Sequence, residues 1–502
     1  MVRIVHESTH LPTEAKDGSD EQGVICAPQI EGETMNGMDR DYDVIIIGGG
    51  PGGSTCATML SRAGHKVLLF EREKFPRFHI GESLTAFAAD AFKKLGVYEE
   101  LKKINYVKKK GLHFVLPDKE KKVYFPEYLK NEPDEIPWAF QMRRSILDEV
   151  LLRNAEKSGA IVRERHAVRR VIFEGDRAVG VVFRNLEGGP EAPEEEARAK
   201  WIIDATGQAG LINRHLEDNC YDDFLLDDKI SIFSHWRGPL KITNSDDELN
   251  FKLCVHENRR DWAWYIPVDK DVVSIGVVID RASVKNRDKS LETLFYEYID
   301  KIPFVRDLVN DPAFERIEKF RGVKDFSYRS KRYYGPGWAL TGDAAGFLDP
   351  IFSTGLQITF NSAFALSEAI DKALKNDAPD QVLFENYRKV LDTFFRINAT
   401  LVYRFYECGI DFDKMQSGWY MWRHTPWANF WQRLRFLYYG SRIIVHPRQK
   451  VLAWAREVLF GNVRKGNEIA RLFILLAENY EKLHEERMRA AAPRLEFNEL
   501  ET

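Results

Sequence analysis

Cysteine is scarce in this 502-residue sequence, and the cysteines present form no recognisable pattern. None of the five belongs to a Cys-x-x-Cys pair, and they are spread along the chain as Cys26, Cys56, Cys220, Cys254 and Cys408. This distribution argues against a metal site and against a disulfide framework. A reducing, cytoplasmic location is the simpler expectation.

Long apolar runs and an excess of one charge are also missing. No stretch is apolar for long enough to span a bilayer, so we expect no integral membrane segment. The amino terminus lacks the basic start and apolar core of a secretory signal. Lys and Arg number 73 and Asp and Glu 77, giving a net charge of -4, so we expect no nucleic-acid partner.

The composition that remains is that of a globular protein with more than one domain. Hydrophobic residues make up 44% and charged residues 30% of the chain, as in soluble folded proteins. Chains beyond about 250–300 residues usually divide into domains. Residues 1–40 are polar and acidic, and they have too few large apolar side chains to offset the entropy of ordering, so we expect a disordered tail there.

Ordered structure is expected to begin at Asp43 with a βαβ unit. Residues 44–47 form a short apolar run, as in a strand buried on both faces. A helical stretch follows from 52 to about 63, and residues 66–70 form a second buried strand. From about 361 onward the pattern is mostly helical.

A glycine fingerprint lies between the first strand and the helix. Gly48 makes the tight turn, Gly50 lets the backbone approach a pyrophosphate, and Gly53 lets helix and strand pack closely. The helix amino terminus stabilises the phosphate charge. Glu71 ends the second strand at the spacing of about 20 residues expected of the acid that binds a ribose hydroxyl. The unit predicts a Rossmann-like dinucleotide-binding fold of the α/β class.

Later segments resemble motifs of the FAD-dependent aromatic monooxygenase superfamily, which favours FAD as the cofactor. Residues 201–207 and 338–345 each read as a strand running into a small-residue turn. The superfamily aspartate of the Gly-Asp pair holds the ribityl chain, which implies that role for Asp343. Residues 141–145 resemble a segment whose arginine contacts FAD, which implies Arg144; an ordinary surface arginine is the alternative.

The heptapeptide 261–267 contains a Trp-x-Trp-x-Ile-Pro sequence. Alternation alone places two tryptophans on one face of a strand, filling a core, with the proline ending the strand. The sequence also resembles the signature of flavin-dependent halogenases, where it crowds the flavin and discourages direct monooxygenation. The resemblance implies a flavin and substrate tunnel lined by Trp262, Trp264, Ile266 and Pro267.

A lysine is the implied catalytic residue. Lys109 stands five residues before the aromatic Phe114, as a lysine does in halogenases. There, reduced FAD, O2 and halide give hypohalous acid, which the lysine hydrogen-bonds or converts to a haloamine. Because Lys108, Lys109 and Lys110 are consecutive, a solvated face is the alternative. Together with the tryptophan motif, the spacing favours the catalytic role.

Residues 347–355, called the halide loop below, resemble the halogenase segment that follows the Gly-Asp motif. In that family the backbone amides of a Thr-Gly pair bind chloride, which implies Thr354 and Gly355 here. Successive amides at a turn or helix start can hold an anion. A helix N-cap formed by Ser353 or Thr354 is a second interpretation, and both could hold.

Two further positions bear on the substrate. Phe352 stands where tryptophan halogenases carry a glutamate, and the resemblance then implies an electron-rich substrate such as a phenol or pyrrole. Residues 75–83, which include His79, resemble phenol halogenases. His79 is therefore expected near the flavin with Phe352 and Ser353, and a structural histidine is an equal alternative.

The resemblance covers about residues 41–365 and implies a domain plan. It consists of an α/β, Rossmann-like FAD-binding domain, a β-rich substrate domain and a helical C-terminal region. The FAD-binding domain is expected at 41–225 and again at 335–375, which carries the flavin and halide loop. The substrate domain is expected at 226–334, with about 105–140 belonging to it, and the helical region at 376–502.

The sequence thus predicts a FAD-dependent halogenase that uses reduced FAD, O2 and chloride or bromide on an electron-rich, phenolic aromatic. With one dinucleotide fingerprint, we expect a separate flavin reductase to supply reduced FAD. The substrate is free or carried by a protein, and the basic segment 430–465 could dock an acidic carrier, contact anionic lipid, or pack as ordinary helices. An aromatic hydroxylase and a non-catalytic flavin-binding docking protein remain alternatives.

Overall fold

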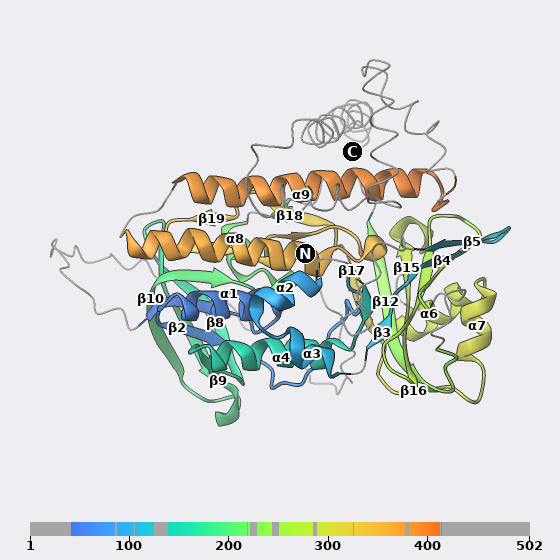
Figure 1. Cartoon of the computed structure of the whole chain (residues 1–502), viewed down its shortest axis with the longest axis horizontal. Helices are drawn as coiled ribbons and strands as arrows, with labels where there is room; N and C mark the ends of the chain where they lie inside the picture. The colour runs from blue at the N-terminus through green and yellow to red at the C-terminus, as the bar shows by residue number, and fades with distance from the viewer. Residues whose placement is uncertain are drawn as a thin grey trace, which may run out of the picture.

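The computed structural model describes residues 42–411 and 413. Within that span it leaves out 86–87, 105, 125–138, 218, 221–227, 243–249, 285–288, 325 and 377–380. The predictions of a disordered tail at 1–40 and of a docking segment at 430–465 lie outside the described residues. Two large sheets dominate the described part, with helices packed on both (Figure 1).

The first sheet confirms the predicted Rossmann-like fold. Its strand order is β19-β20-β10-β1-β2-β7, and all neighbours pair in parallel except β19 with β20. Helix α1 (Pro51–Arg62) connects β1 to β2 as the expected crossover. The strands are β1 (Tyr42–Ile47), β2 (Val67–Phe70), β7 (Ile161–Arg163), β8 (His166–Glu174), β9 (Arg177–Asn185), β10 (Glu194–Asp204), β19 (Tyr334–Gly335) and β20 (Trp338–Leu340).

Strand β10 is longer than the sequence pattern indicates. Its first part, Glu194 to Arg198, pairs antiparallel with β9, and its second part pairs in parallel with β1. The sequence pattern indicates a strand only from about residue 201, yet Glu194–Glu196 already belong to the ladder with exposed side chains. Only the backbone is needed for pairing, so charged residues on a solvated face do not end a strand.

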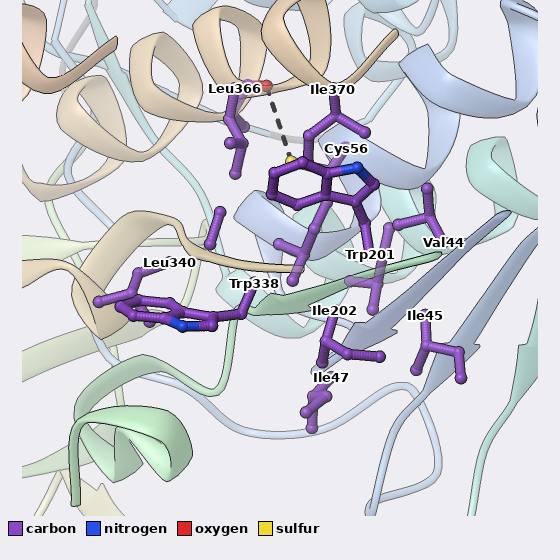
Figure 2. Close-up of a cluster of buried hydrophobic side chains, with 14 of the residues drawn as sticks. Val44, Ile45, Ile47, Cys56, Trp201, Ile202, Trp338, Leu340, Leu366 and Ile370 are labelled. Carbon is purple, nitrogen blue, oxygen red and sulfur yellow. Dashed lines mark hydrogen bonds between the residues drawn. The ribbon is translucent and has the colours of Figure 1, made fainter. Parts of the chain in front are cut away.

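The core of the FAD-binding part lies between the first sheet and two helices. Figure 2 shows Val44, Ile45 and Ile47 of β1 and Ile202 of β10 near Cys56 of α1. Leu366 and Ile370 of α8 pack on the same group. The continuous apolar runs of these strands are therefore explained by burial on both faces.

The second sheet is mostly antiparallel and forms the other body in Figure 1. Only β4 and β13 pair in parallel. Every residue of β14 and β15 is buried, because helices α6 and α7 cover one face and the halide loop with α9 packs on the other. The strands, in spatial order, are β16 (Glu315–Arg316), β12 (Lys229–Arg237), β15 (Val272–Asp280), β14 (Trp262–Pro267), β13 (Lys252–Val255), β4 (Gly111–Val115) and β5 (Glu120–Tyr124), with β17 (Arg321–Lys324) also on β12.

Small strand pairs connect the two bodies. Strand β3 (Val107–Lys108) pairs with β6 (Phe140–Gln141). A three-stranded sheet is formed by β11 (Asn219–Cys220), β18 (Tyr328–Ser330) and β21 (Gly346–Phe347). The remaining helices are α2 (Ala88–Leu95), α3 (Tyr98–Lys102), α4 (Arg144–Lys157), α5 (Leu211–Leu216), α6 (Leu291–Ile299), α7 (Pro303–Val309), α8 (Gly355–Lys375) and α9 (Gln381–Glu407), with short 3-10 turns at Leu186–Gly188, Gly207–Ala209, Arg281–Ser283, Gly342–Ala344 and Pro350–Phe352.

Helices α8 and α9 lie side by side, and α9 extends from the first sheet to the second (Figure 1). Helix α8 begins at Gly355, before the predicted start near 361, because Ser353 takes a left-handed conformation (φ +56°) and releases the chain into the helix. None of the described helices is apolar over enough of its length to cross a membrane. In the same residues no cluster of His, Cys, Asp and Glu could hold a metal ion.

Candidate active site

The glycine loop has the geometry of a phosphate cradle. Gly48 has φ +106°, and a Cβ there would lie 2.5 Å from the carbonyl oxygen of Ala205. A Cβ on Gly53 would lie 1.9 Å from the carbonyl oxygen of Gly48, so helix and loop meet too closely for any side chain. Beside Gly50, by contrast, a Cβ would meet only Nη2 of Arg77 at 3.5 Å. The open side of the loop is therefore where a pyrophosphate fits.

Glu71 holds this loop in place. Its carboxylate is buried, Oε2 accepts a hydrogen bond from the amide of Gly49 at 2.8 Å, and Oε1 accepts one from the amide of Glu73 at 2.8 Å. A carboxylate oxygen accepts two hydrogen bonds, so both atoms can still accept one from a ribose hydroxyl.

Arg144 is buried, so the surface-arginine alternative is wrong. Its Nε and Nη2 donate to both carboxylate oxygens of Asp148, at 2.7 and 3.0 Å, and its Nη1 donates to the carbonyl of Ile80 at 2.7 Å. Arg77 adds a second cation 3.2 Å from Asp148. Burial alone would raise the pKa of Asp148, but the two guanidinium groups overcome that effect and lower it. The cluster fixes the segment that leads to Ser83.

Two polar groups fit a polar cofactor. Burial raises the pKa of Asp343 to about 6, and the charge of Arg144 opposes this rise. Gln141 is fully buried, and neither its amide nitrogen nor its amide oxygen has a hydrogen-bond partner among the described residues. Buried polar atoms are almost always paired in folded proteins. The hydroxyls and ring atoms of FAD would supply the missing donors and acceptors.

Lys109 is the buried member of the lysine run. It is 6% exposed, whereas Lys108 is exposed and Lys110 half-buried. Its Nζ donates to Oγ of Ser83 at 2.9 Å and lies 4.7 Å from the centre of the Phe251 ring. Burial lowers the pKa of Lys109 to about 7. At neutral pH the amine is therefore present in both protonation states.

Ser83, the hydrogen-bond partner of this lysine, carries no role in the sequence argument. Ser83 lies within the motif 75–83, but only folding brings it to Lys109. Glu82 points elsewhere, with Oε1 2.8 Å from Nε2 of His235 on β12, and both side chains are buried. The signal for Ser83 was present in the Gly-Glu-Ser sequence, but nothing local linked it to the lysine.

The tryptophans of β14 fill a core, as their alternation predicts. Trp262 and Trp264 are 2% and 4% exposed, and their rings lie 6.0 Å apart. The indole of Trp262 donates to the hydroxyl of Tyr406 at 2.8 Å, and that of Trp264 donates to Ser274 at 3.1 Å. The same apolar cluster includes Ile266 and, from the halide loop, Ile351, with Phe347 and Phe352 packed against it. Pro267 ends the strand.

The halide loop presents backbone amides at the start of α8. The side chain of Asp349 accepts the amide of Ile351 at 2.9 Å and so caps the turn Pro350–Phe352. Thr354 occupies the N-cap position of α8, as one interpretation predicts, but its hydroxyl makes no capping hydrogen bond. The first amides of a helix have no partner within the helix, so those that begin at Gly355 are available to an anion.

His79 and Phe352 complete the predicted set. The His79 ring is exposed, with Nδ1 2.6 Å from the carbonyl oxygen of Ile80. Phe352 is half-buried, and its ring centre lies 5.2 Å from that of Phe405.

Comparison with known proteins first defines a class. Residues 41–391 match the family model described as "FAD binding domain". This match agrees with the cradle at Gly50 and the buried polar groups at Gln141 and Asp343. The protein is a FAD-binding flavoprotein.

The relatives then define the family. The chain is 32% identical over 374 residues to the 1H-pyrrole-2-carbonyl-[peptidyl-carrier protein] chlorinase of Pseudomonas fluorescens, covering 70% of this chain and 81% of that one. It is 29% identical to the tryptophan 2-halogenase of Chondromyces crocatus, covering 72% and 67%. The solved structure of the flavin-dependent brominase Bmp2 matches with TM-score 0.65 and 26% identity, covering 83% of this chain and 98% of that one. The chain belongs to the flavin-dependent halogenase family and is a FAD-dependent halogenase.

Proposed function

We propose that this halogenase acts on a phenolic aromatic and that Lys109 is its catalytic residue. The observation that carries the proposal is the burial of one lysine out of three consecutive ones, with Nζ held 2.9 Å from Ser83. Reduced FAD with O2 supplies the oxidising equivalents that convert chloride or bromide to hypohalous acid. The protein must then deliver the halogen to carbon.

Lys109 can deliver it in either protonation state. With a pKa of about 7, about half of the side chains are neutral amines at pH 7. A neutral amine attacks the halogen of hypohalous acid, so that an N–halogen bond forms, the O–halogen bond breaks and water leaves. The ammonium form instead donates a hydrogen bond that polarises the acid. In both cases Ser83 holds the nitrogen in place.

The substrate class is inferred from Phe352. A phenyl ring cannot take up a proton or assist the electrophile, so the substrate must activate its own ring. A phenolate does so because the oxygen donates electron density to the ring. A pyrrole is also electron-rich, and the P. fluorescens relative acts on one bound to a peptidyl-carrier protein. A carrier-bound pyrrole is therefore the second candidate.

The remaining roles follow from the motifs and their positions. We assign the amides of Thr354 and Gly355 to the halide and the glycine loop, Glu71, Arg144 and Asp343 to FAD. We assign the walls of the flavin and substrate tunnel to seven side chains that lie on β14, in the halide loop or in the motif 75–83. They are Trp262, Trp264, Ile266, Pro267, Phe352 and Ser353, with His79 at the flavin end.

The domain plan and the partner are proposals of the same kind. The first sheet draws its strands from residues 42–204 and 334–340, and the second from 111–124 and 229–324. This supports an FAD-binding domain at 41–225 and 335–375, with a substrate domain at 226–334 and 105–140. The single dinucleotide fingerprint supports a separate flavin reductase.

A substrate panel tests the function. Phenols, pyrroles and carrier-bound pyrroles are incubated with protein, reduced FAD, O2 and bromide, and products are read by their bromine isotope pattern. We expect brominated phenols. NADPH consumption by the purified protein, with hydroxylated products and no need for halide, would establish a hydroxylase instead.

Variants of the lysine run test the mechanism. We expect Lys109→Ala to consume reduced flavin and O2 but to lose about 100-fold or more in product per flavin oxidised, since positioned acid-base groups contribute on that scale. Lys108→Ala, at an exposed position, should keep most of the yield. Lys109→Arg should not rescue, because the larger, planar guanidinium has a different shape and cannot form the neutral amine. Wild-type yield in Lys109→Ala rejects the assignment.

A further inference from the structure

A chain of hydrogen bonds, buried at both ends and half-buried at Tyr406, links the tryptophan strand to the halide loop through α9. The indole Nε1 of Trp262 donates to the hydroxyl of Tyr406 at 2.8 Å. That hydroxyl donates in turn to Oδ2 of Asp349 at 3.0 Å. The other oxygen of Asp349 accepts the amide of Ile351 inside the halide loop at 2.9 Å. A tyrosine hydroxyl has one proton to donate, so the direction of the chain is fixed.

We propose that Tyr406 is a positioning residue that sets halide affinity by holding the halide loop against β14. The inference rests on the proposed halide site at Thr354 and Gly355. It gives a role to α9, a helix outside the glycine fingerprint, the tryptophan motif and the halide loop. Tyr406 touches neither halide nor flavin in this proposal and acts through Asp349.

Because both ends of the chain are buried, loss of one of its hydrogen bonds should change the packing of the halide loop. Trp262 is 2% exposed and Asp349 is 3% exposed, so water does not readily replace a lost partner. Lys229 is 4% exposed, and its Nζ lies 4.1 Å from the centre of the Tyr406 ring. Burial raises the pKa of Asp349 to about 6, and the charge of Lys229 on β12 opposes this rise. Above that pH the carboxylate is mostly ionised and accepts a hydrogen bond at each oxygen.

A second contact from the same turn of α9 holds the other end of the loop. The ring of Phe405 lies 5.2 Å from that of Phe352 and 5.8 Å from that of Phe114 on β4. Two consecutive residues of α9 therefore contact the two ends of the segment from Asp349 to Phe352. Tyr406 contacts Asp349, and Phe405 contacts Phe352. Ser353 and the N-cap Thr354 follow at once. A displacement of residues 349–352 therefore also displaces the backbone amides at the start of α8.

The test is Tyr406→Phe, which keeps the ring and its contact with Lys229 but removes the hydroxyl. A buried hydrogen bond contributes about 0.5–1.5 kcal/mol, so we expect the bromide dissociation constant to rise about two- to tenfold. It is measured by bromide titration of thermal stability, with gluconate holding the ionic strength constant. The KM for bromide should rise by the same factor, while the KM for the aromatic substrate stays near the wild-type value.

Tyr333→Phe is the matched control. Tyr333 is 2% exposed and donates to Asp392 of α9 at 3.1 Å, so the same type of bond is lost on the same helix but away from the halide loop. We expect a comparable loss of thermal stability with the wild-type bromide constant. Within a linear chain, adding Trp262→Phe to Tyr406→Phe should raise the bromide constant little further.

The outcomes separate the inference from the proposed function. If Tyr406→Phe keeps the wild-type bromide constant while losing as much stability as Tyr333→Phe, Tyr406 is only structural and the inference is wrong. If the wild-type protein binds bromide and produces bromide-dependent product, the halide site stands whatever the variant does. A wild-type protein whose stability and products ignore bromide overturns the halide site and the inference with it.

Discussion

At the scale of single residues, Gly50 is a position where the glycine serves cofactor binding and is not required for folding. A Cβ at Gly53 would collide with backbone, whereas one at Gly50 would meet only the end of the Arg77 side chain. The glycine at position 50 is therefore not required by packing. Because position 50 carries no side chain, the cofactor can approach the amino terminus of α1.

We expect Gly50→Val to fold but to purify without FAD. The φ and ψ of Gly50, -66° and -179°, are accessible to any residue, so the cost to the apoprotein should be about 1 kcal/mol or less. Flavin content is read from the absorbance of the purified protein, and folding from urea denaturation. A yellow Gly50→Val protein with full flavin content would refute the cradle. Gly53→Val, in contrast, should not accumulate as folded protein.

Burial of Lys109 lowers the stability of the fold but gives the lysine the pKa that its proposed chemistry uses. Its pKa is about 7 in the folded protein and about 10.4 in an unfolded chain. Between these pH values the unfolded chain holds a proton that the folded protein has released, so stability rises with pH across this window. Below pH 7 both states are protonated, and the full cost of a buried charge is present.

Lys109→Met should therefore stabilise the protein, most strongly at low pH. We expect a gain of about 2–5 kcal/mol in the free energy of unfolding at pH 6, which shrinks as the pH approaches 10. Thermal melts at pH 6, 7.5 and 9 measure it, and Lys108→Met at an exposed position is the control. A gain that is absent, or that grows with pH, would show that the lysine is not buried as a partly charged amine.

At the scale of elements, strand β14 owes its packing to a glycine in its neighbour. Trp264 pairs with Gly276 of β15 across the sheet, and a Cβ at Gly276 would lie 2.2 Å from Cζ2 of the indole. The ring occupies the space that a side chain would take. The packing of the Trp-x-Trp motif therefore also depends on Gly276, which lies outside the motif.

Gly276→Ala should destabilise the protein by about 1–3 kcal/mol through overpacking. We expect Gly276→Ala combined with Trp264→Leu to recover part of the loss, because the smaller side chain leaves room for the methyl group. Urea denaturation of the two single variants and the double variant gives the coupling. Additive losses would mean that the methyl group is accommodated elsewhere.

Features encoded by neighbouring residues could be predicted from the sequence, whereas contacts between residues far apart in the chain could not. The βαβ unit was predictable because apolar runs and glycine spacing are local signals, as at Ile45 and Gly48. The length of β10 was not, because partner strands decided it. The spacing to Phe114 singled out Lys109 as a candidate, but no local pattern indicated its contact with Ser83. The contact of Tyr406 with Asp349 joins residues far apart in the chain, so no local pattern encodes it.

At the scale of the whole molecule, α9 connects the two bodies. Near its start, Phe384 stacks on Trp201 of β10 at 5.1 Å, and the hydroxyl of Tyr387 donates to the carbonyl of Leu340 on β20. At its end, Phe405 and Tyr406 contact β4, β14 and the halide loop. One helix thus extends from the FAD-binding sheet to the halide loop (Figure 1).

A break in this helix should weaken halide binding without releasing FAD. Thr393 is exposed in the middle of α9, and proline there costs about 3 kcal/mol and kinks the helix. We expect Thr393→Pro to raise the bromide dissociation constant while flavin content stays near wild type, because the glycine loop belongs to the first sheet. Thr393→Ala is the control. A wild-type bromide constant in Thr393→Pro would mean that the two ends of α9 act independently.

The span of α9 has a consequence for anyone who wishes to redesign the enzyme. On the proposal that α9 positions the halide loop, substitutions on its inner surface change bromide affinity and the packing between the two sheets together, so a variant library placed there alters two properties at once. The free ends of β4 and β5 lie on the far side of the second sheet from the glycine loop (Figure 1). Phe114 of β4 contacts Phe405 of α9, so selection for new aromatic substrates can start at the other positions of that hairpin.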